Sequence, residues 1–478
     1  MKSDDLRHRL TRRRLRPAIL AMAITCCWTV PAAGQYSVAS AGQTGTITRS
    51  VPSGPASNEI VRLTLRDAIT RGLRYNLATI ESGENARIAR GQRLLALSKL
   101  LPQVSAGLSE NVDQLSLATF GLQNLPGIPN IVGPFSYTSA DASASQTLFS
   151  FESIKRFQAA RTAEQAAQLS YQDILDAVTL TVGNVYLQVI EADSRIQAQQ
   201  AQVRNAQALY DQALDEVQAG TAPRIEATRT EVQLHIEQYD LSVARNNFEL
   251  AKLALGRAIG LPLGQQFELA DQVPYSEINP PTVEDALNIA YRSRSDLHAA
   301  LDDEKSATQT ASAVRGERYP VVAVNGDYGD IGPTLGHSHG DFTFQAAVRV
   351  PIFTGGRIKG EATQAEAELQ QRKAEAENVR GQVDYDVRAA FLNLDAAKEQ
   401  VAVAKQNVDL ANETLARSKD RFTSGVTDSV EVVQAEQSLA SANDQYITSL
   451  YDHNLAKLSL ARALGVARTS YQQYLGGK

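Results

Sequence analysis

The same eleven-residue sequence occurs almost unchanged at two places, as LAKLALGRAIG at residues 250–260 and as LAKLSLARALG at residues 455–465. The two copies are 205 positions apart, and the same offset relates Gly220 to Gly425 and Glu226 to Glu431. Internal repeats of this length decide the fold class before any local pattern does. The sequence therefore predicts two copies of one large unit in a chain of 478 residues.

The first 34 residues have the composition of a secretory signal. Six arginines between Arg7 and Arg16 precede an apolar run over residues 18–30, and small residues follow. The run is shorter than the roughly 20 residues that a membrane-spanning helix needs, so we predict a signal peptide at 1–34, cleaved near Gly34 or near Ala41. Cys26 and Cys27 are the two cysteines of the chain and both lie in it. The mature chain would then have no thiol for a disulfide or a metal, although a lipid-attached cysteine is a minor alternative.

Charge and motifs exclude several classes of function. Without residues 1–34 the chain keeps 40 Lys and Arg against 51 Asp and Glu, a net charge of −11, which argues against a nucleic-acid partner. We find no nucleophile setting, no paired carboxylates in a cleft and no cofactor fingerprint, so we expect no enzyme and no cofactor. His337 and His339 form a lone His-x-His pair, which is a weak metal signal, and we expect no metal site.

Prolines and changes of period divide the chain into segments. Thr64 and Thr282 can each cap a helix, and we expect these helices to run to Pro102 and Pro320. The predicted segments are a flexible leader at 35–60, a first structural repeat at 61–261, a linker at 262–281, a second structural repeat at 282–466 and a tail at 467–478.

After each of those prolines the apolar residues recur with a period of two, which is typical of strands with one apolar face. We predict strand pairs at about 102–150 and about 320–353, one hairpin in each repeat. The clearest stretch places four residues on one apolar side, which we predict to face the membrane: Phe342, Phe344, Val348 and Val350. Plain packing is an equally good explanation for the two phenylalanines.

The period then becomes helical. Every seventh residue from Leu175 to Val217 is apolar, and positions 205 residues further on repeat the ladder at Val387, Leu394 and Val401. Such a seam is typical of coiled coils. We predict long helices at about 153–260 and about 355–465, and an unbroken helix from residue 153 to 217 would be on the order of 100 Å long.

The strands limit how the chain can meet a membrane. Every backbone N–H and C=O group in lipid must be paired, so only a closed barrel is allowed. Two hairpins give four strands, whereas closed outer-membrane barrels begin at about eight, and about twelve leave room for a passage. We therefore expect three chains to pool their strands in outer-membrane lipid as a homotrimer.

The whole arrangement resembles the TolC family of outer-membrane efflux channels over roughly residues 63–466. VPIFTGGR at 350–357 is similar to the family's turn from the second strand of a pair into the long helix, whereas QTLFSF at 146–151 lacks the glycines. The resemblance implies a fold that is mainly α with membrane β: a twelve-stranded trimeric β-barrel above an α-helical barrel.

The resemblance also implies a function and partners. The chain would be an outer-membrane subunit that extends into the periplasm and works as a passive conduit in a tripartite efflux or type I secretion system. A periplasmic adaptor and an inner-membrane pump would be its partners. The alternative is a soluble periplasmic coiled-coil scaffold or adaptor protein, against which the apolar strand face argues.

The family's turn between the long helices carries acids that ring a narrow entrance, with a tyrosine and an arginine that help to hold it closed. The matching pore-entrance positions are Glu431 for the first acid, Gln434 where a second acid could stand, Phe422 for the tyrosine, Thr427 for the arginine and Glu226 for the acid of the first copy. Solvated glutamates near a helix N-terminus are the simpler explanation of Glu431 and Glu226. The family uses the turns around Gly220, Ser424 and Gly425 for adaptor contact, although turn glycines explain Gly220 and Gly425 more simply.

Overall fold

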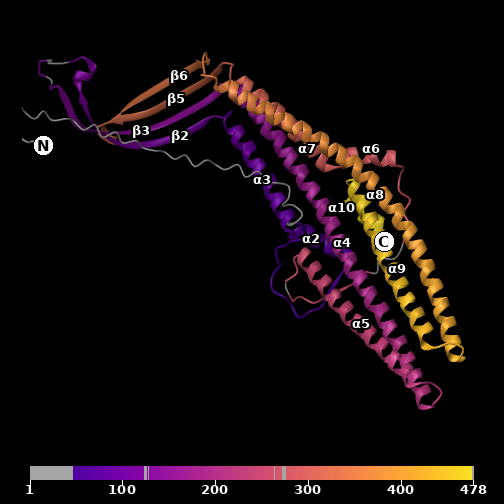
Figure 1. Cartoon of the computed structure of the whole chain (residues 1–478). Coiled ribbons are helices and arrows are strands. Elements are labelled where there is room, and N and C mark those ends of the chain that lie inside the picture. Colours follow the sequence, from indigo (N-terminus) through magenta and orange to yellow (C-terminus); the bar gives the residue numbers. More distant parts are fainter. Residues whose placement is uncertain (1–46, 123–125, 128, 263, 272–275, 476–478) are drawn as a thin grey trace, which may run out of the picture. The chain divides into compact units, whose positions relative to one another are not determined.

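The computed structural model describes residues 47–122, 126–127, 129–262, 264–271 and 276–475 (Figure 1). The predicted signal peptide, residues 35–46 of the predicted leader and the last three residues lie outside the described residues.

The two repeats have the same order of helices and strands. The first contains α2 (Leu65–Tyr75), α3 (Leu77–Ser98), β2 (Gln103–Ser116), β3 (Ile131–Phe149), α4 (Phe151–Gln218) and α5 (Arg224–Ala258). The second contains α6 (Val283–Ser293), α7 (Ser295–Gly316), β5 (Val321–Gly332), β6 (His339–Arg349), α8 (Arg357–Thr423) and α9 (Ser429–Ala463). Helices α5 and α9 begin and end 205 residues apart, so the offset found in the sequence relates whole helices.

The helix before each strand pair is broken once, whereas we expected it to run without a break to the proline. The first break is at Asn76, whose backbone is extended and whose side chain accepts a hydrogen bond from the Ala78 N–H at 2.9 Å. The second is at Arg294, which is also extended and whose buried guanidinium pairs with Asp296 and with Asp386 at 2.6 Å. The Asn76 side chain satisfies a backbone N–H at the start of α3, and the two aspartates neutralise the buried Arg294 charge. Each break therefore costs little free energy.

The four predicted strands form one antiparallel sheet in the order β2-β3-β5-β6, and Figure 1 shows them side by side. Each repeat contributes one hairpin, and the central pair β3-β5 joins the two repeats. Strand β6 ends at Arg349, so Val350 and the rest of the predicted strand to residue 353 lie beyond it. The proline at position 351 cannot donate a ladder hydrogen bond, which explains the early end.

The predicted leader, linker and tail have local structure of their own. Strand β1 (Val61–Leu63) pairs in parallel with β4 (Phe267–Leu269), so the predicted linker contains a strand. The described part of the predicted leader makes backbone hydrogen bonds to the first repeat: the Val51 N–H donates to the Tyr75 carbonyl at 2.9 Å, and the Ser53 N–H donates to the Gly260 carbonyl at 3.0 Å. The predicted tail contains a helix, α10 (Ala467–Leu475).

The heptad positions lie in the core between the long helices. Val182 and Val189 of α4 and Val387 of α8 are fully buried. Helix α4 is also long and apolar enough to cross a membrane by composition, but half of its most apolar window is buried inside the chain. We therefore assign α4 to the helical core, where its small Gly183 lets Leu458 of α9 approach closely.

Candidate channel surfaces: sheet faces and helical turns

The register of the sheet separates its side chains into two faces of opposite chemistry. Directly paired residues share a face, and the pairs that include Val104, Ala142, Tyr328 and Phe342 place apolar side chains together. We call this side the apolar face; its members are Val104, Ala106, Leu108, Ala140, Ala142, Ala144, Val322, Val324, Gly326, Tyr328, Phe342, Phe344, Ala346 and Val348, together with two polar residues, Gln146 beside Val324 and Asp330 beside Ala140.

The large side chains of the apolar face are open to the surroundings. Val104 is 76% exposed, and Phe342 and Phe344 are 73% and 72% exposed. Val348 is also exposed, and so is Val350 just past the strand. An exposed apolar patch that covers four strands is far from what a monomeric soluble protein presents to water.

The opposite side of the sheet, the polar face, carries hydroxyl, amide and carboxylate groups. The Ser105 and Ser143 hydroxyls hydrogen-bond across β2 and β3 at 2.7 Å. The members of the polar face are Ser105, Gly107, Ser109, Asn111, Ser139, Asp141, Ser143, Asn325, Asp327, Gly329, Asp341, Thr343 and Gln345. This side suits water, whereas the apolar face suits lipid.

The sheet has two open edges among the described residues. Strands β2 and β6 each pair on one side only, so a row of backbone N–H and C=O groups faces outward along each. A sheet in lipid cannot keep such edges, because each unpaired group there costs several kcal/mol.

Apolar stripes also follow two of the long helices, α5 and α8. Helix α5 packs on α4, and α8 packs on α9, while α4 and α9 contact each other. The Arg195 guanidinium of α4 donates to the Thr448 hydroxyl of α9 at 3.0 Å, which holds the two inner helices together. The exposed residues are Val232, Ile236, Tyr239, Val243, Leu250 and Leu253 on α5, and Tyr385, Leu392, Val403 and Leu410 on α8.

The turns between the long helices are built alike. Gly220 and Gly425 have φ of 71° and 69°, the left-handed region that favours glycine. Their N–H groups donate to the carbonyls of Val217 at 3.1 Å and Phe422 at 2.9 Å. The Ser424 hydroxyl donates to the Asp420 carbonyl at 2.8 Å, and Ser424 is exposed.

In the second copy, Glu431 of α9 is bound to its own helix pair. Its carboxylate accepts hydrogen bonds from the Thr427 hydroxyl at 2.7 Å and from the Ser418 hydroxyl at 3.3 Å, and it forms an ion pair with Arg421 at 3.2 Å. Sequence reasoning missed Arg421, which is exposed on the last turn of α8. The sequence did contain a signal for Arg421, because this arginine directly precedes Phe422, one of the predicted entrance positions.

In the first copy, Glu226 of α5 reaches the other repeat. It pairs with Arg229 at 2.9 Å and accepts a hydrogen bond from the Ser429 hydroxyl of α9. The Glu226 side chain is 14% exposed against 37% for Glu431. Sequence reasoning missed Arg229 and Ser429, because no local pattern tells that the start of α5 lies against the start of α9.

Two further pore-entrance positions differ in burial. Phe422 is 7% exposed and packs in the hydrophobic cluster of Leu415, Val432 and Leu439. In the single chain it therefore faces the core of the α8-α9 pair, and its place at an entrance stays a prediction. Gln434 is exposed and borders a shallow groove between α8 and α9.

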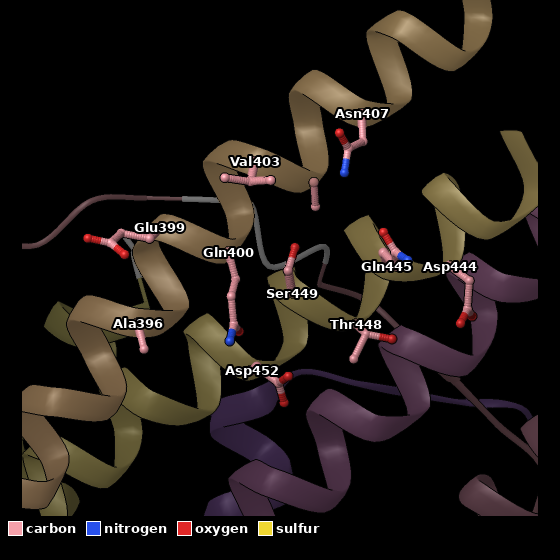
Figure 2. Close-up of a pocket in the computed structure, with 11 residues that line it drawn as sticks. Ala396, Glu399, Gln400, Val403, Asn407, Asp444, Gln445, Thr448, Ser449 and Asp452 are labelled. Atoms are coloured by element: carbon pink, nitrogen blue, oxygen red, sulfur yellow. The ribbon is translucent and has the colours of Figure 1, made fainter. Parts of the chain in front are cut away.

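A second groove, of about 650 Å³, lies further along the same two helices. Figure 2 shows three carboxylates around it, Glu399 from α8 and Asp444 and Asp452 from α9. Asp444 pairs with Arg195 of α4 at 3.2 Å, and burial raises the pKa of Asp452 above its ordinary value. The groove is open, and its lining also includes the apolar Ala396, Val403 and Ala404. The described residues contain no group of three or more His, Cys, Asp or Glu placed to hold a metal ion.

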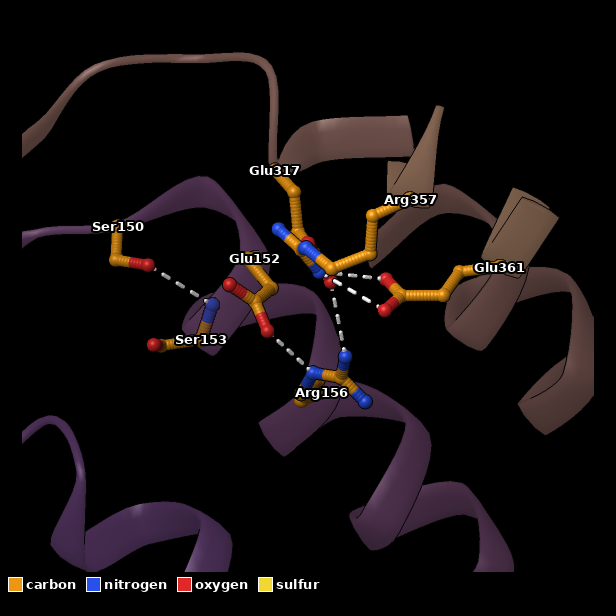
Figure 3. Close-up of polar contacts among 7 residues, drawn as sticks. All are labelled: Ser150, Glu152, Ser153, Arg156, Glu317, Arg357 and Glu361. Carbon is orange, nitrogen blue, oxygen red and sulfur yellow. Dashed lines mark hydrogen bonds and ion pairs between the residues drawn. The ribbon is translucent and has the colours of Figure 1, made fainter. Parts of the chain in front are cut away.

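A third polar site lies where the chain passes from the sheet into the long helices (Figure 3). The Glu317 carboxylate after α7 accepts from Arg156 of α4 at 3.2 Å and from Arg357 of α8 at 2.8 Å. Glu317 therefore joins the starts of the long helices of both repeats.

A duplicated chain with a lipid-suited sheet face, open sheet edges and paired long helices defines an outer-membrane channel protein. The family model described as outer membrane efflux protein matches residues 84–261 and 286–466. The chain belongs to this family, that of the TolC-type outer-membrane channels.

Individual relatives match this chain over most of its length and most of their own. The chain is 22% identical over 403 residues to the pyoverdine export outer membrane protein OpmQ of Pseudomonas putida, covering 83% of this chain and 84% of the relative. It is also 22% identical over 375 residues to the outer membrane protein TolC of Vibrio cholerae, covering 77% and 83%. The crystal structure of the Campylobacter jejuni CmeC outer membrane channel matches with a TM-score of 0.75 at 15% identity, covering 84% of this chain and 86% of that one.

Proposed function

We propose that the chain is the subunit of a homotrimeric outer-membrane channel, a passive conduit across the periplasm and the outer membrane in an efflux or type I secretion system. The single observation that carries the proposal is the exposed apolar face on a sheet whose two edges are open. Three copies of four strands make twelve, which close a barrel with room for a passage.

Closing the sheet into a barrel turns one face outward and the other inward. If the apolar face contacts lipid, the polar face with Asp141, Asp327 and Asp341 lines the barrel interior. The β6 edge of one copy then pairs with the β2 edge of the next, and all backbone groups of the wall are satisfied.

The long helices support the same assembly. The apolar stripes of α5 and α8 lie on the two outer helices of each chain, so α5 of one copy can pack against α8 of the next and bury both stripes. The three chains would then form a helical barrel that continues the β-barrel into the periplasm.

We assign the turn ends of this barrel to the entrance. Carboxylates repeated around an axis attract cations and repel anions. We expect Glu431, the exposed Gln434 and the half-buried Thr427 to face such an axis in the trimer. Phe422 supports the turn from within the helix pair, and Glu226 ties the two helix pairs together. The exposed turns at Gly220, Ser424 and Gly425 would contact a periplasmic adaptor, which links the channel to an inner-membrane pump.

The test compares one substitution on each face of β6. Phe344→Asp places a charge in lipid, at a cost somewhat below the roughly 2–4 kcal/mol of an arginine or lysine at the bilayer midplane, so we expect loss of the trimer from the outer-membrane fraction. Thr343→Asp, one residue away on the polar face, should assemble normally and conduct ions in a planar bilayer. Wild-type protein that stays in solution after lysis without detergent would instead identify a periplasmic scaffold or adaptor and overturn the proposal.

A further inference from the structure

The contact between the two repeats predicts the contact between two chains. Within the chain, β3 of the first repeat pairs with β5 of the second, and α4 packs against α7. The counterparts of β3 and α4 in the second repeat are β6 and α8, and the counterparts of β5 and α7 in the first repeat are β2 and α3. In a closed ring of identical chains, β6 and α8 of one chain therefore meet β2 and α3 of the next in the same way.

Burial in the single chain agrees with this correspondence. Helices α3 and α7 begin 218 positions apart, and Ala313 of α7 is fully buried, whereas Leu95 at the same position of α3 is 69% exposed. Thr162 of α4 is buried and donates to the Gln309 side chain of α7 at 3.0 Å. Ala367 of α8, 205 positions after Thr162, is exposed. Helices α3 and α8 are thus uncovered on the sides where α7 and α4 cover each other.

The contact between α4 and α7 ends in a cluster of charges, which Figure 3 shows. The Glu317 carboxylate, 9% exposed, accepts from Arg156 at 3.2 Å and from Arg357 at 2.8 Å. Each arginine also pairs with a glutamate of its own helix, Arg156 with Glu152 at 2.6 Å and Arg357 with Glu361 at 2.9 Å. The cluster is one anion between two cations.

The corresponding positions carry the opposite charges. The offset of 205 takes Arg156 to Glu361 and takes Glu152 to Arg357, and the offset of 218 takes Lys99 to Glu317. Lys99 and Glu317 end α3 and α7 with the same right-handed helical backbone, and each lies three residues before the proline that precedes a strand. Inversion of every sign makes one cation, Lys99, between two anions.

Lys99 lacks these partners within the single chain. Its side chain is exposed, and it forms no ion pair with any residue that the structure describes. Glu361, which would meet it from a neighbouring α8, is 39% exposed. A lysine ammonium has three donors and no acceptor, so it can bind two carboxylates.

Resting on the proposed homotrimer, we infer that Lys99 lies between Glu152 of its own chain and Glu361 of the neighbouring copy. This cluster is the charge-inverted counterpart of the one around Glu317, and the two kinds alternate around the passage from sheet to helix.

The inversion also decides which surfaces can meet. A chain that placed its α3 against α4 of another copy would bring Lys99 to Arg156, and one that placed α7 against a neighbouring α8 would bring Glu317 to Glu361. Like charges in contact disfavour both arrangements. The charge pattern therefore selects the order in which first and second repeats alternate around the ring.

A zero-length carbodiimide tests the contact in wild-type protein, because it forms an amide only between an amine and a carboxylate that touch. We expect treatment of the purified trimer in detergent to give a covalent dimer on denaturing gels. Digestion of that band should release a peptide with Lys99 joined to Glu361, and Lys99→Gln should abolish it. An intact trimer that yields no such peptide, or Lys99 joined to Glu152 alone, overturns the inference.

A charge swap measures what the contact does for assembly. We expect Lys99→Glu and Glu361→Lys each to speed dissociation of the heated trimer in detergent about tenfold, because each places like charges together. The double variant should return to within about threefold of wild type. A double variant that dissociates as fast as the faster single one contradicts the inference.

Lys373→Glu is the matched control for these rates. Lys373 is an exposed lysine of α8, and its counterpart Gln168 stays exposed on α4, although α4 is packed against both α3 and α7. The control should dissociate at the wild-type rate, and a control as fast as Lys99→Glu would show that any added negative charge loosens the trimer.

Failure of the proposed function gives a different result. Untreated protein that runs as a monomer in detergent and yields no covalent dimer means that the homotrimer itself is wrong. A stable trimer without the joined Lys99 and Glu361 peptide leaves the channel intact and sinks only the charge-inverted contact.

Discussion

Corresponding residues of the two repeats lie on equivalent helices but contact different residues. Lys252 of α5 is 22% exposed, and its ammonium lies 5.3 Å and 5.5 Å from the ring centres of Phe248 and Phe267. Lys457 of α9, 205 residues later, is fully buried and donates to the Ser276 carbonyl and hydroxyl, both at 3.2 Å. The duplication preserved the helices, and the segment between the repeats supplies different partners to each copy.

The acidic residues at the turns differ in the same way. Glu226 binds across to the other helix pair, whereas Glu431 binds within its own. The glutamate of the first copy therefore connects the two helix pairs, whereas the glutamate of the second copy bonds only within its own pair. The following substitutions test whether these differences matter, from the largest expected effect to the smallest.

The largest effect should come from Gly183, which corresponds to the exposed Arg388 of the second repeat. A Cβ atom at Gly183 would lie 2.4 Å from the Leu458 Cδ2 atom, and Leu458 is fully buried. We expect Gly183→Val to lower the free energy of unfolding by roughly 3 kcal/mol, because overpacked cores must shift. Thermal unfolding in detergent measures the effect.

Arg388→Val is its matched control in the second repeat, at an exposed position that pairs with Asp384. It should change the unfolding midpoint little, because exposed ion pairs contribute at most about 1 kcal/mol. Equal losses in the two variants would show that the two repeats pack alike at this position.

The next effect depends on pH. Burial lowers the pKa of Lys457 from its ordinary 10.5 to about 8. Between these values the unfolded chain binds more protons than the folded chain, so stability rises as the pH rises through that window, by on the order of 3 kcal/mol. We expect Lys457→Met to abolish this rise in thermal unfolding measured from about pH 7.5 to about pH 10.5.

Lys252→Met removes the corresponding partly exposed lysine and serves as the control. The wild-type pH dependence should persist in it. A pH profile that is the same in wild type and Lys457→Met would mean that the buried amine stays solvated in the assembled protein.

Much of the fold could be predicted from the sequence, because its signals are local. Alternation, heptads and prolines predicted both hairpins and the long helices. The helix breaks at Asn76 and Arg294 and the β1-β4 pair were not predicted. They depend on contacts between segments far apart in sequence, such as the Arg294 bond to Asp386.

The candidate site was predicted less completely. The offset of 205 found both Glu226 and Glu431, since it compares positions and needs no structure. It could not find Ser429 or Arg421, because the partner of a carboxylate depends on which helix end lies against it.

The two turn glutamates should differ in what their loss does to the channel. Glu226→Gln weakens the hydrogen bond from Ser429 that joins the helix pairs and removes the ion pair with Arg229 within α5, at a cost of about 1.5 kcal/mol. We expect a higher single-channel conductance in planar bilayers, because the helix pairs separate more easily.

Glu431→Gln should instead lower the cation preference and leave the conductance near that of wild type. The amide that replaces the carboxylate is neutral, yet its oxygen can still accept the hydrogen bond from the Thr427 hydroxyl. Reversal potentials in a salt gradient measure the preference. Unchanged selectivity would show that the Glu431 carboxylate does not line the pore.

The smallest effect concerns the passage from sheet to helix, where the first repeat uses Ser150 and the second uses Gly356. Ser150 caps α4 by accepting from the Ser153 N–H at 3.1 Å, whereas Gly356 precedes α8 with φ of 87° and no side-chain cap. Ser150→Ala should cost about 1 kcal/mol and Ser150→Gly only a few tenths, since glycine is tolerated at a helix start. Thermal unfolding of both variants decides the point: equal losses would mean that the Glu317 bridge to Arg156 and Arg357, and not the cap, fixes where the long helix begins.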